Sequence, residues 1–94
     1  MNTRIHFFIS GRVQGVLFRQ SARSKALELG LSGWARNLVD ERVEIVAEGE
    51  KEKVEQFIDW CKKGPPLAKV EHLDTSFEEY KGEFKEFSIR DFGF

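Results

Sequence analysis

The sequence predicts an α+β domain of the ferredoxin-like class, a split βαβ sandwich with two helices on one face of an antiparallel sheet. Apolar residues recur at strand or helical spacing in segments ordered β-α-β-β-α-β, with an extra strand at the C-terminus. Each predicted helix is apolar along only one stripe, so both helices must cover the same face of a single sheet. Right-handed crossovers then place the first and third strands side by side in the middle.

The first half of the chain contains three of the predicted strands. Apolar residues alternate along each of these three segments. In a fourth segment they recur at helical spacing, and a glycine that can end a helix follows it. The predicted strands are residues 4–10, 31–38 and 43–48, the helix is residues 18–29, and residues 39–42 form a hairpin turn between the last two strands.

The second half contains one helix and two strands. Apolar residues at i, i+3, i+4 and i+7 predict a helix over residues 50–62, which Gly64 and Pro65 prevent from continuing. The strand candidates are residues 68–77 and 83–91, and in the second of them Phe87 and Ile89 share one face.

Length and composition indicate a single domain over residues 1–94, because a chain of this length has room for one core. Nine Phe exclude intrinsic disorder. A formal net charge of −1 argues against a main role in coating nucleic acid or an acidic membrane. One Cys cannot form an internal disulfide or a Cys-based zinc site, and no apolar stretch is long enough for a membrane span. We expect a cytoplasmic protein, with a monomer as the default.

The segment Gly11-Arg12-Val13-Gln14-Gly15-Val16-Leu17-Phe18-Arg19 is the part of the chain most indicative of chemistry. It leads from a strand into a helix, whose first N–H groups lack helical partners and lie at the positive end of the helix dipole. Two glycines allow the loop amides to converge on an anion of phosphate size, and the Arg19 guanidinium can add a bidentate pair. On spacing alone a second interpretation stays open, because glycine loops before helices are common and an arginine there is usually a solvated charge. The segment is neither a Walker P-loop nor a dinucleotide-binding fingerprint.

Taken together with Gly33-Trp34-Ala35-Arg36-Asn37, the loop segment closely resembles the acylphosphatase family. The resemblance covers nearly the whole chain. It implies an acylphosphatase-like form of the ferredoxin-like fold and hydrolysis of carboxyl–phosphate bonds with no metal or other cofactor. The sequence departs from the family pattern at Ala35, where Val is usual, and at Glu41, where a turn glycine usually follows Asp40.

The resemblance also implies roles for individual residues. The family's catalytic arginine falls on Arg19, and its catalytic asparagine, which orients the attacking water, falls on Asn37. The implied substrate is a small-molecule acyl phosphate, and inorganic phosphate is a product. No nucleic acid or membrane partner is implied. The phosphoryl group is expected to be held by the amides of the 12–18 loop and by Arg19, with the binding residues being Gln14, Gly15, Val16, Leu17, Phe18 and Arg19.

Two other function classes remain as alternatives. RNA-recognition domains share the βαββαβ order, but they need exposed aromatic residues on the central strands. Residues 43–48 contain none and carry two acids, although His6 and Phe8 offer a small aromatic surface on the first strand. A non-catalytic anion-sensing or protein-interaction domain is the second alternative. The intact Arg19 and Asn37 argue against it.

Several other residues are given no chemical role. His6 and His72 lack neighbours at metal-ligand spacing, and Cys61 lies on the inward stripe of its helix, which predicts a buried, inert thiol. The roles of Arg12 and Arg36 stay open, since either side chain could raise the positive potential around the loop.

Overall fold

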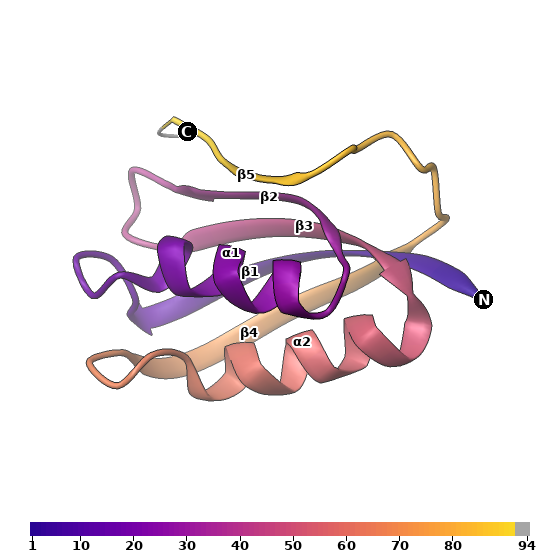
Figure 1. Cartoon of the computed structure of the whole chain (residues 1–94). Helices are drawn as coiled ribbons and strands as arrows, with labels where there is room; N and C mark the ends of the chain where they lie inside the picture. Colours follow the sequence, from indigo (N-terminus) through magenta and orange to yellow (C-terminus); the bar gives the residue numbers. More distant parts are fainter. Residues whose placement is uncertain (92–94) are drawn as a thin grey trace.

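A five-stranded sheet with two helices on one face makes up the computed structural model, which describes residues 1–91 (Figure 1). Its strand order is β4-β1-β3-β2-β5, so the predicted pairing of the first and third strands in the middle is confirmed. The ferredoxin-like class is confirmed as well. In chain order the elements are β1 (Asn2–Arg12), α1 (Phe18–Glu28), β2 (Ser32–Asn37), β3 (Val43–Glu50), α2 (Lys51–Lys63), β4 (Lys69–Glu78) and β5 (Phe87–Ile89).

The sheet is mixed, whereas the sequence predicts an antiparallel one. The pairs β1–β3, β1–β4 and β2–β3 are antiparallel, but β5 pairs with β2 in parallel. The cause is the path of the chain. β4 runs opposite to β2, so the chain reverses once more before β5 and then lies along β2 in the same direction.

The last strand is shorter than the predicted residues 83–91. Within the predicted range, the strand that pairs with the sheet is Phe87–Ile89. Before it, the backbone amides of Lys81, Gly82 and Glu83 donate to the carboxylate of Glu48, with N···O distances of 2.8, 3.1 and 3.2 Å. This stretch therefore satisfies its amides with a side chain rather than with a neighbouring strand. Phe87 is buried, and Ile89 lies at the rim of the same face.

The core lies between the sheet and the two helices. Side chains alternate along a strand, so Ile5, Phe7 and Ile9 of β1 all point toward the helices and are fully buried. Cys61 is fully buried on α2, as its helical spacing predicts. The helices contribute one buried stripe each, formed by Phe18, Ala22 and Ala26 of α1 and by Val54, Phe57 and Cys61 of α2.

The path of the chain brings distant segments to one end of the molecule. The loop between β1 and α1 and the hairpin between β2 and β3 lie at the same end of the sheet (Figure 1). α1 packs against β2 and runs antiparallel to it, so the start of α1 and the end of β2 lie at the same end of the molecule. No helix within residues 1–91 is long and apolar enough to cross a membrane.

Candidate active site

Residues 13–17, which join β1 to α1, are held in place by apolar side chains. Val13, Val16 and, at the start of α1, Phe18 are all buried in or against the core. Gly15 and Leu17 lie between these anchors and are exposed. The loop is therefore fixed by its inward side chains, which leaves its backbone at the surface.

Two residues of this loop have left-handed backbone. Gly15 has φ 73°, and a Cβ atom added there would contact nothing within 4 Å, so the backbone angle rather than space favours glycine. Leu17, with φ 64° and ψ 26°, adopts the same conformation at a cost of about 1–2 kcal/mol. Its side chain is 65% exposed, so burial does not offset that cost. Strain of this kind concentrates at ligand-binding loops.

The amides at the start of α1 have no helical acceptors. The helix begins with a hydrogen bond of 3.0 Å from the Ser21 amide to the Leu17 carbonyl, and the N-cap residue Leu17 supplies no side-chain cap. The N–H groups before Ser21 therefore remain available at the positive end of the helix dipole. Such a group of amides is suited to an anion.

Arg19 is the second residue of α1 and is half-buried. It takes part in no ion pair or side-chain hydrogen bond with another residue of 1–91, and the same holds for Arg12 at the end of β1. The other five arginines each contact a carboxylate, a carbonyl or an aromatic ring: Arg4, Arg23, Arg36, Arg42 and Arg90. The two arginines without such a contact are thus the two that border the loop.

Asn37 is the last residue of β2. Alternation along the strand places it on the helix-covered face together with Ala35, which belongs to the core. Only 9% of Asn37 is exposed, and its Oδ1 atom is buried without a hydrogen-bond partner within residues 1–91. A buried amide oxygen left unpaired costs about 1–3 kcal/mol, and an exception of this kind in a native protein calls for an explanation.

The side chain of Gln14 joins the loop to the β2–β3 hairpin. Its Nε2 donates to the carbonyl oxygens of Leu38 and Arg42, at 2.8 Å each. Because the side-chain amide is engaged in this way, the backbone N–H is the donor of Gln14 that remains for an anion. The sequence contains no local signal for this contact, since the partners lie 24 and 28 residues away.

The hairpin next to Asn37 is itself ordered by local bonds. Leu38 donates its amide to the Arg42 carbonyl at 2.8 Å, and the Asp40 carboxylate accepts from the amide and Nε of Arg42 at 3.2 and 2.7 Å. Desolvation raises the pKa of Asp40, but the hydrogen bonds and charge of Arg42 outweigh it and hold that pKa below its usual value. Glu41 adopts the left-handed conformation with φ 75°. The hairpin therefore forms although this position carries no glycine.

Arg36 lies away from the loop. Its neighbour Ala35 faces the core, so Arg36 points to the opposite face of the sheet. There its Nε donates to Glu44 Oε1 at 2.6 Å, and its guanidinium lies 5.1 Å from the centre of the Trp34 ring. The structure thus separates Arg36 from the first turn of α1 and from Asn37.

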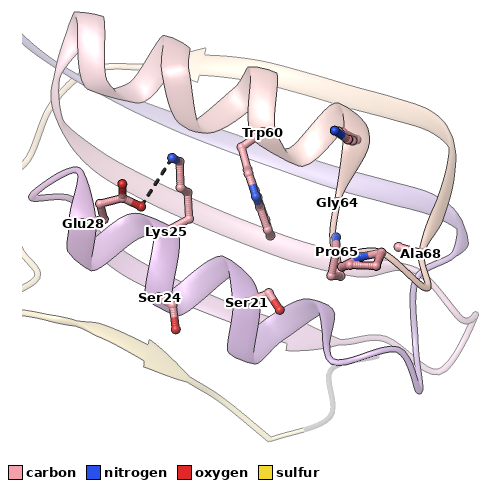
Figure 2. Close-up of a pocket in the computed structure, with 10 residues that line it drawn as sticks. Ser21, Ser24, Lys25, Glu28, Trp60, Gly64, Pro65 and Ala68 are labelled. Atoms are coloured by element: carbon pink, nitrogen blue, oxygen red, sulfur yellow. Dashed lines mark ion pairs between the residues drawn. The ribbon is translucent and has the colours of Figure 1, made fainter.

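A separate groove lies between α1 and α2 (Figure 2). It has a volume of about 880 Å³, and its lining includes Ser21, Trp60 and Pro65. An ion pair between Lys25 and Glu28, with an N···O distance of 3.4 Å, lies along its α1 side. None of the residues predicted to bind or act on substrate lines this groove. Within residues 1–91, no three His, Cys, Asp or Glu side chains are placed to hold a metal ion together.

Comparisons with known proteins identify the family of the chain. A family model described as Acylphosphatase matches residues 5–89. A relative from Methylococcus capsulatus named Acylphosphatase is 55% identical over 86 residues, which cover 92% of this chain and 94% of that protein. Another of the same name, from Roseiflexus sp., is 56% identical over 86 residues, covering 92% of each chain.

A solved structure gives the same result for the fold. The structure of an acylphosphatase from Coxiella burnetii has a TM-score of 0.90 and 40% sequence identity to this chain. The match covers 95% of this chain and 93% of that one. The similarity therefore extends over nearly the full length of both proteins.

Proposed function

The chain belongs to the acylphosphatase family and is an enzyme of that activity, and we propose that it hydrolyses acyl phosphates without a metal. In this proposal the 12–18 loop and Arg19 bind the phosphoryl group, and Asn37 orients the attacking water. One observation carries it. A group of unpaired amides, an arginine without an ionic partner and a buried carboxamide oxygen without a partner occur at the same end of the sheet.

The phosphoryl oxygens accept hydrogen bonds from the amides of residues 14–18 and from the guanidinium of Arg19. Phosphoryl transfer proceeds through a loose transition state, in which negative charge is spread over the equatorial oxygens. Fixed amide dipoles and a bidentate guanidinium stabilise that charge without having to reorganise during the reaction. Arg12, at the exposed start of the loop, raises the local positive potential and attracts the anionic substrate.

Asn37 acts on the nucleophile. Its Oδ1 accepts a hydrogen bond from the water, which directs an oxygen lone pair toward the phosphorus atom. The side chain is neutral, so it adds no negative charge beside an anionic substrate. As the water oxygen bonds to phosphorus, the bond from phosphorus to the acyl oxygen breaks, and the carboxylate leaves with the electron pair. The two protons of the water remain on the phosphate product. The conjugate acid of that leaving group has a pKa of about 4, so no general acid is needed.

We also propose the domain organisation, location, oligomeric state and partners of the enzyme. The chain acts as one domain over residues 1–94, as a cytoplasmic monomer that needs no nucleic acid or membrane and releases inorganic phosphate. The near balance of charge, at a formal net charge of −1, supports the absence of a nucleic acid or membrane partner.

The sheet face away from the helices also argues against an RNA-binding role. Its central strand β3 presents Glu44 and Glu48 there, and both are buried. The Phe8 ring lies 4.6 Å from the guanidinium of Arg42, and the Trp34 ring lies 4.6 Å from that of Arg90. The Phe8 and Trp34 rings, which could otherwise stack on bases, are therefore already covered by arginines.

Hydrolysis of acetyl phosphate in the presence of a metal chelator tests the proposal. Arg19→Ala should fold normally and raise the activation barrier by about 3–5 kcal/mol, because it removes the main charge that stabilises the transition state. Arg19→Lys should fail as well, because an ammonium cannot reproduce the bidentate fork. Arg23→Lys is the matched control on the same helix, since Arg23 donates to the Phe87 carbonyl, outside the loop.

The outcomes separate the candidate functions. Chelator-resistant turnover that Arg19→Ala abolishes supports the proposal. Near-normal turnover in Arg19→Ala, or loss of wild-type turnover with the chelator, contradicts it. Retention of single-stranded RNA in a parallel filter assay would favour the RNA-binding alternative instead.

A further inference from the structure

The side-chain amide of Gln14 links the two halves of the candidate active site. It projects from the loop and donates both of its hydrogen bonds to the hairpin, to the carbonyls of Leu38 and Arg42. Within residues 1–91, no other hydrogen bond joins residues 13–17 to residues 38–42. Within the described residues, Gln14 is therefore the one hydrogen-bonded link between the loop and the hairpin.

The contact is placed next to Asn37. Leu38 follows Asn37 directly, and Leu38 also donates its own amide to the Arg42 carbonyl. The two carbonyls bound by Gln14 thus lie on opposite sides of the hairpin, one after β2 and one before β3. On the loop side, Gln14 lies between the buried Val13 and the left-handed Gly15. One end of the link is anchored in the core, and the other holds the backbone that carries the Asn37 carboxamide.

We propose that Gln14 is a positioning residue for the hydrolysis, holding the Asn37 side chain at the distance from the loop amides that the attacking water requires. The inference rests on the proposed function and adds to it a role for the Gln14 side chain, which does not itself touch the phosphoryl group. A displacement of about 1 Å at a reacting centre can reduce the rate by about 10²-fold, so one lost link is sufficient for a measurable effect.

Gln14→Met tests the role, because methionine keeps the length and volume of the side chain but has no N–H donor. We expect kcat for acetyl phosphate to fall by about 10- to 100-fold. The inhibition constant for inorganic phosphate should change by a much smaller factor, since the loop amides and Arg19 remain. Gln56→Met, on the exposed face of α2, is the matched control and should leave both constants unchanged.

A double-mutant cycle with Asn37→Ala separates positioning from simple loosening of the loop. If Gln14 acts through Asn37, Gln14→Met should have little further effect on kcat once the Asn37 carboxamide is gone. NMR gives a second measurement that does not depend on activity. Gln14→Met should shift the side-chain NH2 signals of Asn37, whereas Gln56→Met should leave them in place.

Three results would overturn the inference: a wild-type kcat in Gln14→Met, effects of Gln14→Met and Asn37→Ala that multiply, or Asn37 signals that do not move. Each of these leaves the proposed function intact. Failure of the proposed function is recognised separately, because it appears as near-normal turnover in Arg19→Ala or as loss of wild-type turnover with the chelator.

Discussion

At the scale of one residue, Asn37 has a feature that lowers stability and that a functional role explains. A buried Oδ1 atom without a partner lowers stability, yet the position is otherwise well packed at the end of β2. The left-handed backbone of Leu17 also lowers stability, and its side chain, which is 65% exposed, gains little from burial to offset that cost. Both features are explained if the site is built for a ligand rather than for the stability of the fold.

Asn37→Ala should therefore separate activity from stability. We expect kcat to fall by about 10²-fold or more, because the water is no longer oriented, while the inhibition constant for phosphate changes little. The free energy of unfolding should change by less than about 1 kcal/mol, because the substitution also removes an unpaired buried oxygen. Urea denaturation and steady-state kinetics on the same samples measure both.

Val43→Ala is the control for this prediction, because Val43 pairs with Asn37 across the strands and is fully buried. It should cost about 2 kcal/mol or more of stability. An Asn37→Ala variant that loses as much stability as Val43→Ala would show that Asn37 mainly holds the fold together. A large rise in the phosphate inhibition constant with unchanged turnover would instead make Asn37 a binding residue.

At the scale of the elements, local patterns predict the ends of the helices and strands to within about two residues, apart from β5, which begins four residues later than predicted. Periodicity succeeds there because each element buries one face. It fails for residues 83–86, because the chain before β5 is held through the amides of residues 81–83 by the distant Glu48 carboxylate. Periodicity also cannot show that the start of α1 and the end of β2 meet at one end of the molecule. That meeting follows from the direction in which α1 packs, and the role of Asn37 came from the family resemblance instead.

The β2–β3 hairpin provides a test of local backbone strain. Glu41 has φ 75°, a conformation that costs a residue with a Cβ about 1–2 kcal/mol. Glu41→Gly should remove this cost but lose part of the gain to the greater freedom of glycine in the unfolded chain. The expected net gain in the free energy of unfolding is about 0.5–1 kcal/mol, measured by urea denaturation.

Glu41→Ala is the matched control, because it removes the carboxylate but keeps the Cβ atom, and it should not stabilise the protein. Equal stabilisation by both variants would mean that the charge of Glu41, rather than its backbone angle, is unfavourable. Turnover should be unchanged in Glu41→Gly if the Gln14 link sets the position of the hairpin.

The segment between β4 and β5 depends on Glu48, whose side chain is fully buried and also lies 3.7 Å from the Arg4 guanidinium. Glu48→Gln keeps the shape but replaces one acceptor oxygen with a donor that faces backbone N–H groups. We expect a loss of about 2–3 kcal/mol in the free energy of unfolding. The turnover of the folded fraction should be normal, because this carboxylate lies on the sheet face away from the helices.

Glu52→Gln serves as the control for loss of a carboxylate, since Glu52 is exposed on α2. It should change stability by no more than about 0.5 kcal/mol. If Glu48→Gln changes the free energy of unfolding as little as Glu52→Gln does, the three amides of residues 81–83 do not depend on the buried charge. The Glu48 carboxylate would then not explain why β5 is short.

At the scale of the whole molecule, one core joins both helices to the sheet. Cys61 is fully buried in it, and burial raises the pKa of its thiol. A thiol reagent should therefore react only when the core opens. In native buffer, labelling should be slower than in denaturant by a factor on the order of 10³ or more.

Lys62→Cys is the control, because Lys62 is the exposed neighbour of Cys61 on α2. In this variant one thiol should react at once and the other slowly. Fast labelling of both would show that α2 detaches from the sheet far more readily than a single cooperative core allows.

The most direct test of the proposed mechanism is a crystal structure with bound inorganic phosphate. We expect the anion in the 12–18 loop, in contact with the amides of residues 14–18 and the guanidinium of Arg19, with the Asn37 carboxamide facing it. Phosphate bound in the groove between α1 and α2 instead, or phosphate in the loop with Arg19 turned away, would contradict the account.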